Sequence, residues 1–322
     1  MLREEAVNYD LEDPLRVFRE HFIFPQHLDQ DCIYLCGNSL GLQPKSLRAH
    51  VNAQLDKWAS QAVEGHFTTP TPWLTIDDMV LESMAKLVGA KSTEVVMMNS
   101  LTCNLHLMMA AFYKPIPTRF RILIEKKAFP SDLHAVTSQI SFHGFDPNQA
   151  LIEITPREGE SCLRTEDIEN AIHEAGDSLA LVLFSGVQYF TGQLFDMKRI
   201  TAAAHSVNAR VGFDLAHAVG NVPLHLHDWG CDFACWCSYK YLNCGPGSIG
   251  SCFVHENNFL SNASNAGLHT LHGWWGHQLK DRFEMLPEFR PCEGAYAYRL
   301  SNPPVLLVAC VRASLDIFDQ VF

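Results

Sequence analysis

Short β-rich apolar runs alternate with helical segments through the central part of the chain, from about residue 95 to 255. This alternation is typical of strands joined by helical crossovers in a parallel sheet. The helical segments include DIENAIHEAG and MKRITAAAHSVNA, and the expected strands are RILIE, ALVLFSGV, ARVGFDLA, DFACWCS and GSCFVHE. The sequence therefore predicts an α/β domain whose active site lies at the carboxyl ends of the strands.

Helical segments are also expected on both sides of this region. LEDPLRVFREHF carries mixed charge, and residues 43–63 place four apolar residues at helical spacing, namely Leu47, Val51, Leu55 and Trp58. Between these two segments, IYLCGNSLG contains the turn chemistry of Gly-Asn-Ser and predicts a chain reversal. At the other end, VLLVACVRASLDIFDQVF predicts an amphipathic helix whose apolar face needs a partner.

The charge balance narrows the class of partner. Thirty-six acidic against 24 basic residues give a formal charge of −12, which argues against nucleic acid and anionic membranes, because phosphates need a surplus of Lys and Arg. The N-terminus lacks an apolar signal core, and no apolar run reaches the length of about 18 residues that a membrane span needs. We therefore predict a soluble, cytoplasmic chain with a small-molecule partner.

Two patterns resemble metal-binding motifs but do not satisfy their spacing. The gaps within one set of cysteines match no common zinc ligand spacing, the set being Cys231, Cys235, Cys237 and Cys244. The eleven cysteines of the chain are interpreted as buried thiols rather than a disulfide framework. His225 and His227 in PLHLHDWG are interpreted as alternating residues on an exposed strand-like segment, with nothing nearby in the sequence to complete a ligand set. No metal site is predicted.

A lysine and an aspartate follow two of the expected strands. Lys240, in CSYKYLNCGPGSIG, lies between a buried strand and a glycine-rich turn. It is either a surface lysine or a partly desolvated amine suited to a Schiff base. Asp214 ends the run VGFD, where a single aspartate is most often a cap. Together the two suit pyridoxal phosphate, since a carboxylate keeps its ring nitrogen protonated while the lysine reaches C4′.

The segment NSLTCNLHLMMAAF offers a candidate phosphate site. Ser100, Thr102 or Asn104 places hydroxyl and backbone donors at the start of an apolar helix. A helix N-terminus suits a phosphate group, although the same residues also serve as a simple N-cap.

Eight segments taken together, in order along nearly the whole chain, resemble the kynureninase family. They are LCGNSLGLQPK, NSLTCNLHL, KKAFPSDLHA, GVQYFTGQLFD, VGFDLAHAVGN, CWCSYKYLNCGPG, GWWGH and RLSNPP. The resemblance implies a fold-type I pyridoxal-phosphate enzyme, similar to class V aminotransferases, with a mostly parallel central sheet. It further implies an N-terminal helical segment at 1–65, a large cofactor-binding domain at 66–290 and the start of an incomplete small domain at 291–322.

The same resemblance assigns roles to individual residues. Lys240 is expected to form the Schiff base, Asp214 to pair with the pyridinium nitrogen and Phe129 to stack on the ring. Apart from the resemblance, Tyr239 is a candidate to relay a proton, because it is adjacent to the lysine and can donate to the phosphate. Further cofactor contacts are expected from Leu101, Thr102, Pro130, Ser131, Asp132, Ser185, His217, Tyr239, Trp274 and Asn302. Contacts to the substrate are expected from His66, Ser301 and Asn302. Of these, Trp274 and Asn302 are expected to reach the cofactor of the neighbouring subunit in a homodimer. The loop between Glu256 and Gly273 looks longer than in the family.

The implied reaction is hydrolysis of L-kynurenine, or 3-hydroxy-L-kynurenine, to anthranilate or 3-hydroxyanthranilate and L-alanine, in tryptophan catabolism and NAD biosynthesis. The family anchors the substrate carboxylate with a small-domain arginine that lies beyond the end of this chain. An alternative is therefore a truncated protein that binds cofactor or a partner without turnover. A cysteine desulfurase is the other enzymatic alternative, with Cys292 and Cys310 as downstream cysteines, but GWWGH and RLSNPP favour kynureninase. The preference between the two substrates stays open.

Overall fold

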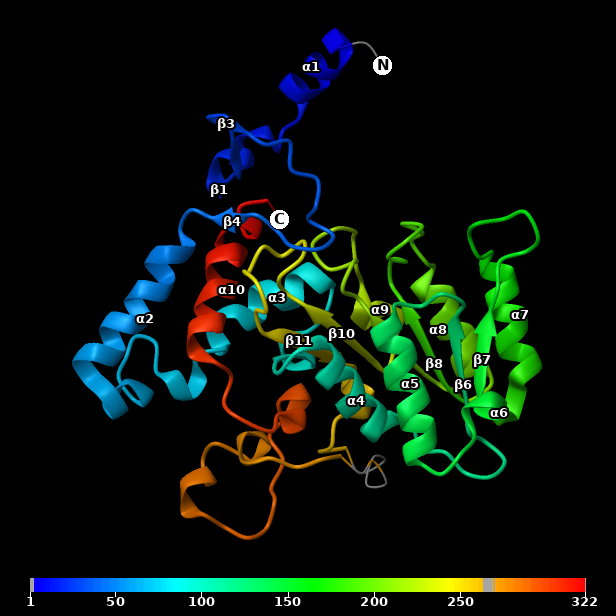
Figure 1. Cartoon of the computed structure of the whole chain (residues 1–322). Coiled ribbons are helices and arrows are strands. Elements are labelled where there is room, and N and C mark those ends of the chain that lie inside the picture. Colours follow the sequence, from blue (N-terminus) through cyan, green and yellow to red (C-terminus); the bar gives the residue numbers. More distant parts are fainter. Residues whose placement is uncertain (1–2, 263–267, 269, 322) are drawn as a thin grey trace.

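The computed structural model describes residues 3–262, 268 and 270–321. At its centre is a seven-stranded sheet in the order β5-β11-β10-β9-β8-β6-β7 (Figure 1). Its strands are β5 (Val95–Met97), β6 (Arg121–Glu125), β7 (Leu151–Ile154), β8 (Leu179–Ser185), β9 (Arg210–Asp214), β10 (Phe233–Cys237) and β11 (Gly250–Val254). Within this sheet β11 runs antiparallel to both of its neighbours, and the other pairings are parallel. The predicted, mostly parallel sheet is confirmed.

The sequence predicts five of these seven strands and does not single out β5 and β7. Those two are three and four residues long, too short for a periodic pattern to stand out. Four further strands of two residues each form small antiparallel pairs in the N-terminal region, β1 with β4 and β2 with β3. They are β1 (Phe22–Ile23), β2 (Gln26–His27), β3 (Gln30–Asp31) and β4 (Gln43–Pro44).

Helices cover both faces of the sheet (Figure 1). They are α1 (Arg3–Glu12), α2 (Leu47–Gln61), α3 (Asp78–Val88), α4 (Leu101–Phe112), α5 (Pro130–Phe142), α6 (Pro147–Ala150), α7 (Thr165–Ala175), α8 (Met197–Ser206), α9 (Leu226–Trp229) and α10 (Val305–Phe318). Side chains of β8 alternate between two apolar cores, with Val182 and Phe184 in one and Leu181 and Leu183 in the other. Burial on both faces explains why the central strands are continuous apolar runs.

The apolar face of the last helix packs against other helices of the same chain. Helix α10 packs against α2 and α3, and it lies beside α2 in Figure 1. Three of its side chains, Val308, Val311 and Leu315, belong to the core on that face of the sheet. Among the described residues, no helix combines the length and the apolar character needed to cross a bilayer. The division at residues 65 and 290 stays a prediction.

Two local predictions need correction. LEDPLRVFREHF is not one helix, because α1 ends at Glu12 and a 3₁₀ turn, Arg16–His21, begins beyond Pro14. PLHLHDWG is not strand-like, since Leu226–Trp229 forms the short helix α9. His225 is exposed before this helix, whereas His227 is partly buried against Glu94, so the two imidazoles do not share an exposed face.

The turn between β10 and β11 positions the predicted lysine. These strands pair antiparallel with Cys237 opposite Gly250, so the intervening residues project from the carboxyl edge of β10. Strand β9 lies parallel to β10 with Asp214 opposite Cys235, which brings the end of β9 to the same edge. Lys240 and Asp214 therefore meet where parallel α/β sheets place their ligands.

Candidate active site

A cavity of about 410 Å³ opens at this carboxyl edge of the sheet. Ten of the residues that the sequence predicts for the cofactor line it, namely Leu101, Thr102, Phe129, Ser131, Asp132, Ser185, Asp214, His217, Tyr239 and Lys240. The other lining residues are Asn38, Ser39, Ser100, Val187, Tyr189 and Ala216. The fold thus gathers residues from several distant segments around one space.

The Lys240 amine lies between an imidazole and an aromatic ring. Its Nζ is 2.9 Å from Nε2 of His217 and 5.9 Å from the centroid of the Phe129 ring. Burial, followed by the nearby lysine charge, lowers the pKa of His217 to about 4. At neutral pH this imidazole is therefore uncharged, and it accepts a hydrogen bond from the lysine instead of repelling it.

Two buried carboxyl groups form another wall of the cavity. Asp214 ends β9, and its Oδ1 accepts a hydrogen bond of 2.7 Å from the backbone N–H of Ala216. Asp132 lies in the first turn of α5. Burial raises the pKa of both groups, and the negative charge of Asp214 raises the pKa of Asp132 further. Oδ1 of Asp132 has no hydrogen-bond partner among the described residues. The pair would be stabilised by a cationic or protonated partner.

A third carboxyl group, Glu125, supports this wall from behind. It is the last residue of β6 and is 2% exposed. The hydroxyl of Ser185 donates to its Oε1 at 2.5 Å, and burial raises the pKa of Glu125. The sequence does not predict a role for Glu125, although its place at the carboxyl end of the expected strand RILIE was an available signal.

The starts of α4 and α5 meet at a third part of the cavity. Ser100 occupies the N-cap position of α4 but makes no side-chain capping hydrogen bond, so the simple N-cap interpretation is wrong. The hydroxyls of Thr102 and Ser131 lie 2.7 Å apart and join the first turns of the two helices. Asn104 instead points into the core, where it donates to the carbonyl of Met98. Hydroxyls beside helix N-termini suit an anion such as a phosphate.

The predicted chain reversal at GNSLG packs against the lysine loop. The backbone N–H of Gly41 donates to the carbonyl of Tyr239 at 2.8 Å, and a Cβ atom on Gly41 would come within 2.3 Å of the carbonyl oxygen of Lys240. Glycine is therefore required for this close approach. The turn brings Asn38 and Ser39 to the cavity, a contact that the local turn pattern alone did not indicate.

The remaining predicted residues lie outside this cavity. Pro130 is the first residue of α5, next to lining residues on both sides. His66 packs edge-on against Trp73, and Trp274 donates its indole N–H to the carbonyl of Arg282. Ser301 and Asn302 are exposed just before α10. Their binding roles stay predictions, and residues 263–267 and 269 of the long loop lie outside the described part of the chain.

Comparison with known proteins places this fold in a class. Residues 33–267 match the family described as aminotransferase class-V. The cysteine desulfurase CsdA from Escherichia coli superimposes with a TM-score of 0.72 over 94% of this chain and 71% of its own, at 16% sequence identity. A cystine C-S lyase, C-DES, solved with its reaction product, gives a TM-score of 0.67 over 89% of this chain and 72% of its own, at 15% identity. At such identities these likenesses show the fold alone, which is that of fold-type I enzymes.

Curated relatives are far more similar in sequence. The kynureninase of Nematostella vectensis is 54% identical over 99% of this chain and 70% of its own length. The kynureninase of Xanthomonas campestris pv. campestris (strain B100) is 54% identical over 99% of this chain and 74% of its own. That of Flavobacterium psychrophilum is 51% identical over the same shares. The chain belongs to the kynureninase family.

Proposed function

We propose that this chain uses pyridoxal 5′-phosphate to hydrolyse L-kynurenine, or its 3-hydroxy derivative, to anthranilate or 3-hydroxyanthranilate and L-alanine. It would then be a hydrolase acting on a carbon-carbon bond of a ketone, in tryptophan catabolism and NAD biosynthesis. One observation carries the proposal: the Lys240 amine, paired with the uncharged His217, shares a single cavity with the carboxyl groups of Asp132 and Asp214. Membership of the kynureninase family supports the choice of substrate.

The residues of the cavity fit each polar group of the cofactor. The hydroxyls of Thr102 and Ser131 at two helix starts suit the phosphate, and Lys240 suits the aldehyde carbon. The carboxyl groups of Asp214 and Asp132 suit a protonated ring nitrogen, which would compensate the unpartnered buried oxygen of Asp132. When bound, the cofactor supplies an electron sink for charge that develops on the amino-acid carbon atoms.

Two side chains are suited to move protons on the substrate. The Lys240 amine takes the proton from Cα, and His217 stays an uncharged hydrogen-bond acceptor because its pKa is lowered to about 4. Burial raises the pKa of Tyr239 to about 12, so its phenol remains protonated and can donate. Water adds to the aryl ketone, the bond between Cβ and the carbonyl carbon breaks, and the two products together contain the atoms of substrate and water.

The phenol of Tyr239 provides a specific check on this assignment. We expect Tyr239→Phe to slow single-turnover formation of anthranilate by about 10²-fold, the lower end of the effect of a positioned proton donor. Rapid-quench measurement with saturating kynurenine gives the single-turnover rate of anthranilate formation directly. An unchanged single-turnover rate would remove Tyr239 from the proton path.

We also propose a homodimer in the cytoplasm. Large apolar side chains of the N-terminal region are exposed in the single chain, including Leu28, Ile33 and Leu35. A second copy would cover such a surface. Trp274 and Asn302, which do not line the cavity of their own chain, would then contact the cofactor of the neighbouring subunit. Sedimentation of the purified protein with added cofactor measures the mass, and a monomer at micromolar concentration would contradict this part.

The decisive experiment follows anthranilate fluorescence during incubation of the purified chain with L-kynurenine and pyridoxal phosphate. We expect turnover in the wild type, and a loss of about 10⁴-fold or more in Lys240→Ala. Lys198→Ala, which alters an exposed lysine on α8, is the matched control and should retain full activity. In the wild type, borohydride should reduce the bond between the cofactor and Lys240, and peptide mass mapping identifies the modified lysine. Trapping without turnover would refute the activity while leaving the cofactor assignment standing.

A further inference from the structure

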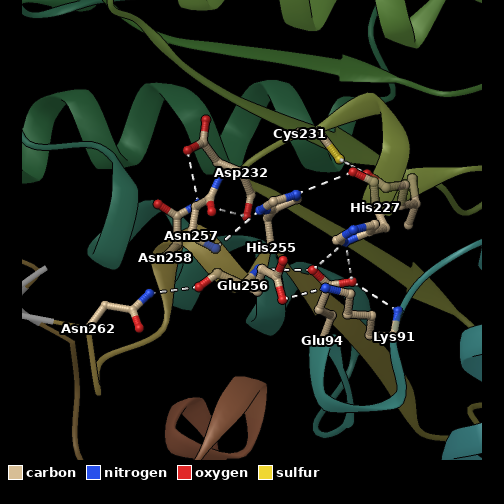
Figure 2. Close-up of polar contacts among 11 residues, drawn as sticks. Lys91, Glu94, His227, Cys231, Asp232, His255, Glu256, Asn257, Asn258 and Asn262 are labelled. Atoms are coloured by element: carbon tan, nitrogen blue, oxygen red, sulfur yellow. Dashed lines mark hydrogen bonds and ion pairs between the residues drawn. The ribbon is translucent and has the colours of Figure 1, made fainter. Parts of the chain in front are cut away.

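Glu94 is a fully buried carboxylate at the edge of the sheet opposite the active-site cavity. It precedes β5 directly, and its side chain is 0% exposed. The backbone N–H groups of Lys91 and Glu256 each donate to it at 2.9 Å. Its two oxygens also lie 2.9 and 3.1 Å from Nδ1 of His227 (Figure 2). Three separate segments of the chain thus meet at one carboxylate.

A second histidine completes the group. His255, 7% exposed, directly follows β11, and its ring stacks parallel to that of His227 with 5.1 Å between centroids. Its Nε2 lies 3.2 Å from the carbonyl oxygen of His227 (Figure 2). One ligand atom from each of Glu94, His227 and His255 lies within 4.8 Å of the other two.

The sheet itself builds this convergence. Strands β5 and β11 pair antiparallel with Val95 opposite Phe253, so Glu94, just before β5, and His255, just after β11, emerge at the same edge. The backbone N–H of His227 donates to the carbonyl of Gly89 at 2.9 Å, which fixes α9 against the segment leading into β5. The sequence offers no ligand near His227, whereas the fold supplies two.

We propose that Glu94, His227 and His255 bind one divalent metal ion of the zinc type, with water as the fourth ligand. Two imidazoles, a carboxylate and a water form a donor set that zinc accepts in tetrahedral geometry. Bonds of about 2.0–2.1 Å in that geometry place ligand atoms about 3.3 Å apart, close to the contacts between Glu94 and His227. His227 is partly exposed, so water reaches the ion from its side.

Binding requires small, balanced proton shifts. The proton on Nδ1 of His227 moves to Nε2, which frees Nδ1 for the metal. His255 turns its Nε2 from the carbonyl of His227 to the metal, its ring tilts away from the parallel stack, and its proton moves to Nδ1. The hydrogen bond that Nδ1 accepts from the N–H of Asn257 is given up. Each of these shifts moves a proton within one imidazole ring, so they release no net proton.

The location makes this a structural site. Because β10 and β11 are antiparallel, with Phe233 opposite Val254 and Cys237 opposite Gly250, His255 and Lys240 lie at opposite edges of the sheet. The metal would join the segment before β5, helix α9 and the end of β11. It should therefore stabilise the fold without taking part in turnover, and its presence does not depend on the proposed function.

The test compares zinc binding by the full chain and by two histidine variants. After removal of metals with EDTA, equilibrium dialysis against ZnCl₂ measures the zinc bound, and thermal unfolding at rising zinc concentration measures the stabilisation. His227→Gln keeps a hydrogen-bond donor for Glu94 but loses the imidazole, and His255→Asn is the second variant. His225→Gln changes the exposed neighbouring histidine and is the matched control.

We expect the wild type and His225→Gln to bind one zinc ion. His227→Gln and His255→Asn should bind zinc at least about 100-fold more weakly, since even loss of an outer-shell partner can lower metal affinity by that factor. Zinc should raise the unfolding temperature of the wild type and the control alone. Cobalt substituted for zinc should show d–d bands of a nitrogen and oxygen site without a thiolate charge-transfer band. Equal zinc binding by His227→Gln, no zinc-dependent rise in unfolding temperature, or a thiolate band from the free cysteines would each overturn the proposal.

Discussion

Aspartates are buried at both edges of the sheet, but the two environments shift the aspartate pKa in opposite directions. At the carboxyl edge, burial raises the pKa of Asp214 and Asp132, and these two carboxyl groups lie beside each other. At the other edge, Asp232 precedes β10 and is equally buried. Burial alone would raise its pKa too, but hydrogen bonds from His205 and the charge of Arg210 outweigh burial and lower it.

This difference distinguishes the candidate cofactor site from a contact that only stabilises the fold. Asp232 accepts hydrogen bonds from the side chains of His205, Arg210 and Asn258 and from the backbone of Val211, so its charge is compensated by the chain itself. Asp132 keeps an unpartnered buried oxygen among the described residues. The charge of Lys240 offsets only part of the cost of burying these carboxyl groups, and the unpartnered oxygen of Asp132 lies where a protonated cofactor ring would compensate it.

Removing the charge of Asp214 should have the largest effect. An amide at this position cannot hold a proton on the cofactor ring, so we expect Asp214→Asn to lower the turnover number by about 10³-fold, or about 4 kcal/mol in the barrier. Anthranilate fluorescence at saturating kynurenine measures this change. Borohydride trapping on Lys240 should persist and serves as the control for cofactor binding. A loss of turnover below about tenfold would show that the charge of Asp214 contributes little to the reaction, contrary to the contrast between the two edges.

Removing the charge of Asp232 should instead lower stability. We expect Asp232→Asn to reduce the free energy of unfolding by about 2–3 kcal/mol, less than for a fully buried pair, because His205 and Arg210 are partly exposed. The folded-state pKa of Asp232 is depressed, so its contribution is present above the ordinary aspartate pKa and is lost as pH falls through the folded value. Urea unfolding measures both effects, with the exposed Asp228→Asn as the control.

Asp132→Asn should have a smaller effect, of the opposite sign. The raised pKa of Asp132 means that the cofactor-free chain loses stability as pH rises from the ordinary aspartate value through the folded one. The amide cannot ionise and avoids this cost, so we expect a gain of about 1–2 kcal/mol at neutral pH and a flatter pH profile. Urea unfolding of the cofactor-free variant at several pH values measures the free energy of unfolding and its pH dependence, with the same Asp228→Asn variant as the control. Destabilisation at neutral pH would mean that the pair is compensated after all.

Local patterns predicted much of the fold and of the candidate active site. Lys240 and Asp214 were identifiable because each follows an apolar run long enough to be read as a buried strand, and strand ends in such sheets face a common edge. Resemblance to the family added Phe129, Asp132 and Ser185, which line the same cavity. The position of Glu125 at the end of an expected strand was visible in the sequence, but its contact with Ser185 depends on β8 lying next to β6, and strand order is not encoded in any local pattern.

The sequence by itself determined the alternation of strands and helices, the lysine and aspartate at strand ends, and the family. These follow from periodicity, burial and short motifs, each of which acts over a few neighbouring residues. Only the tertiary structure decided that GNSLG lies against the lysine loop and that Glu94, His227 and His255 form one group. Those contacts arise from the reversed direction of β11 and the packing of α9, and they join residues that the chain separates widely.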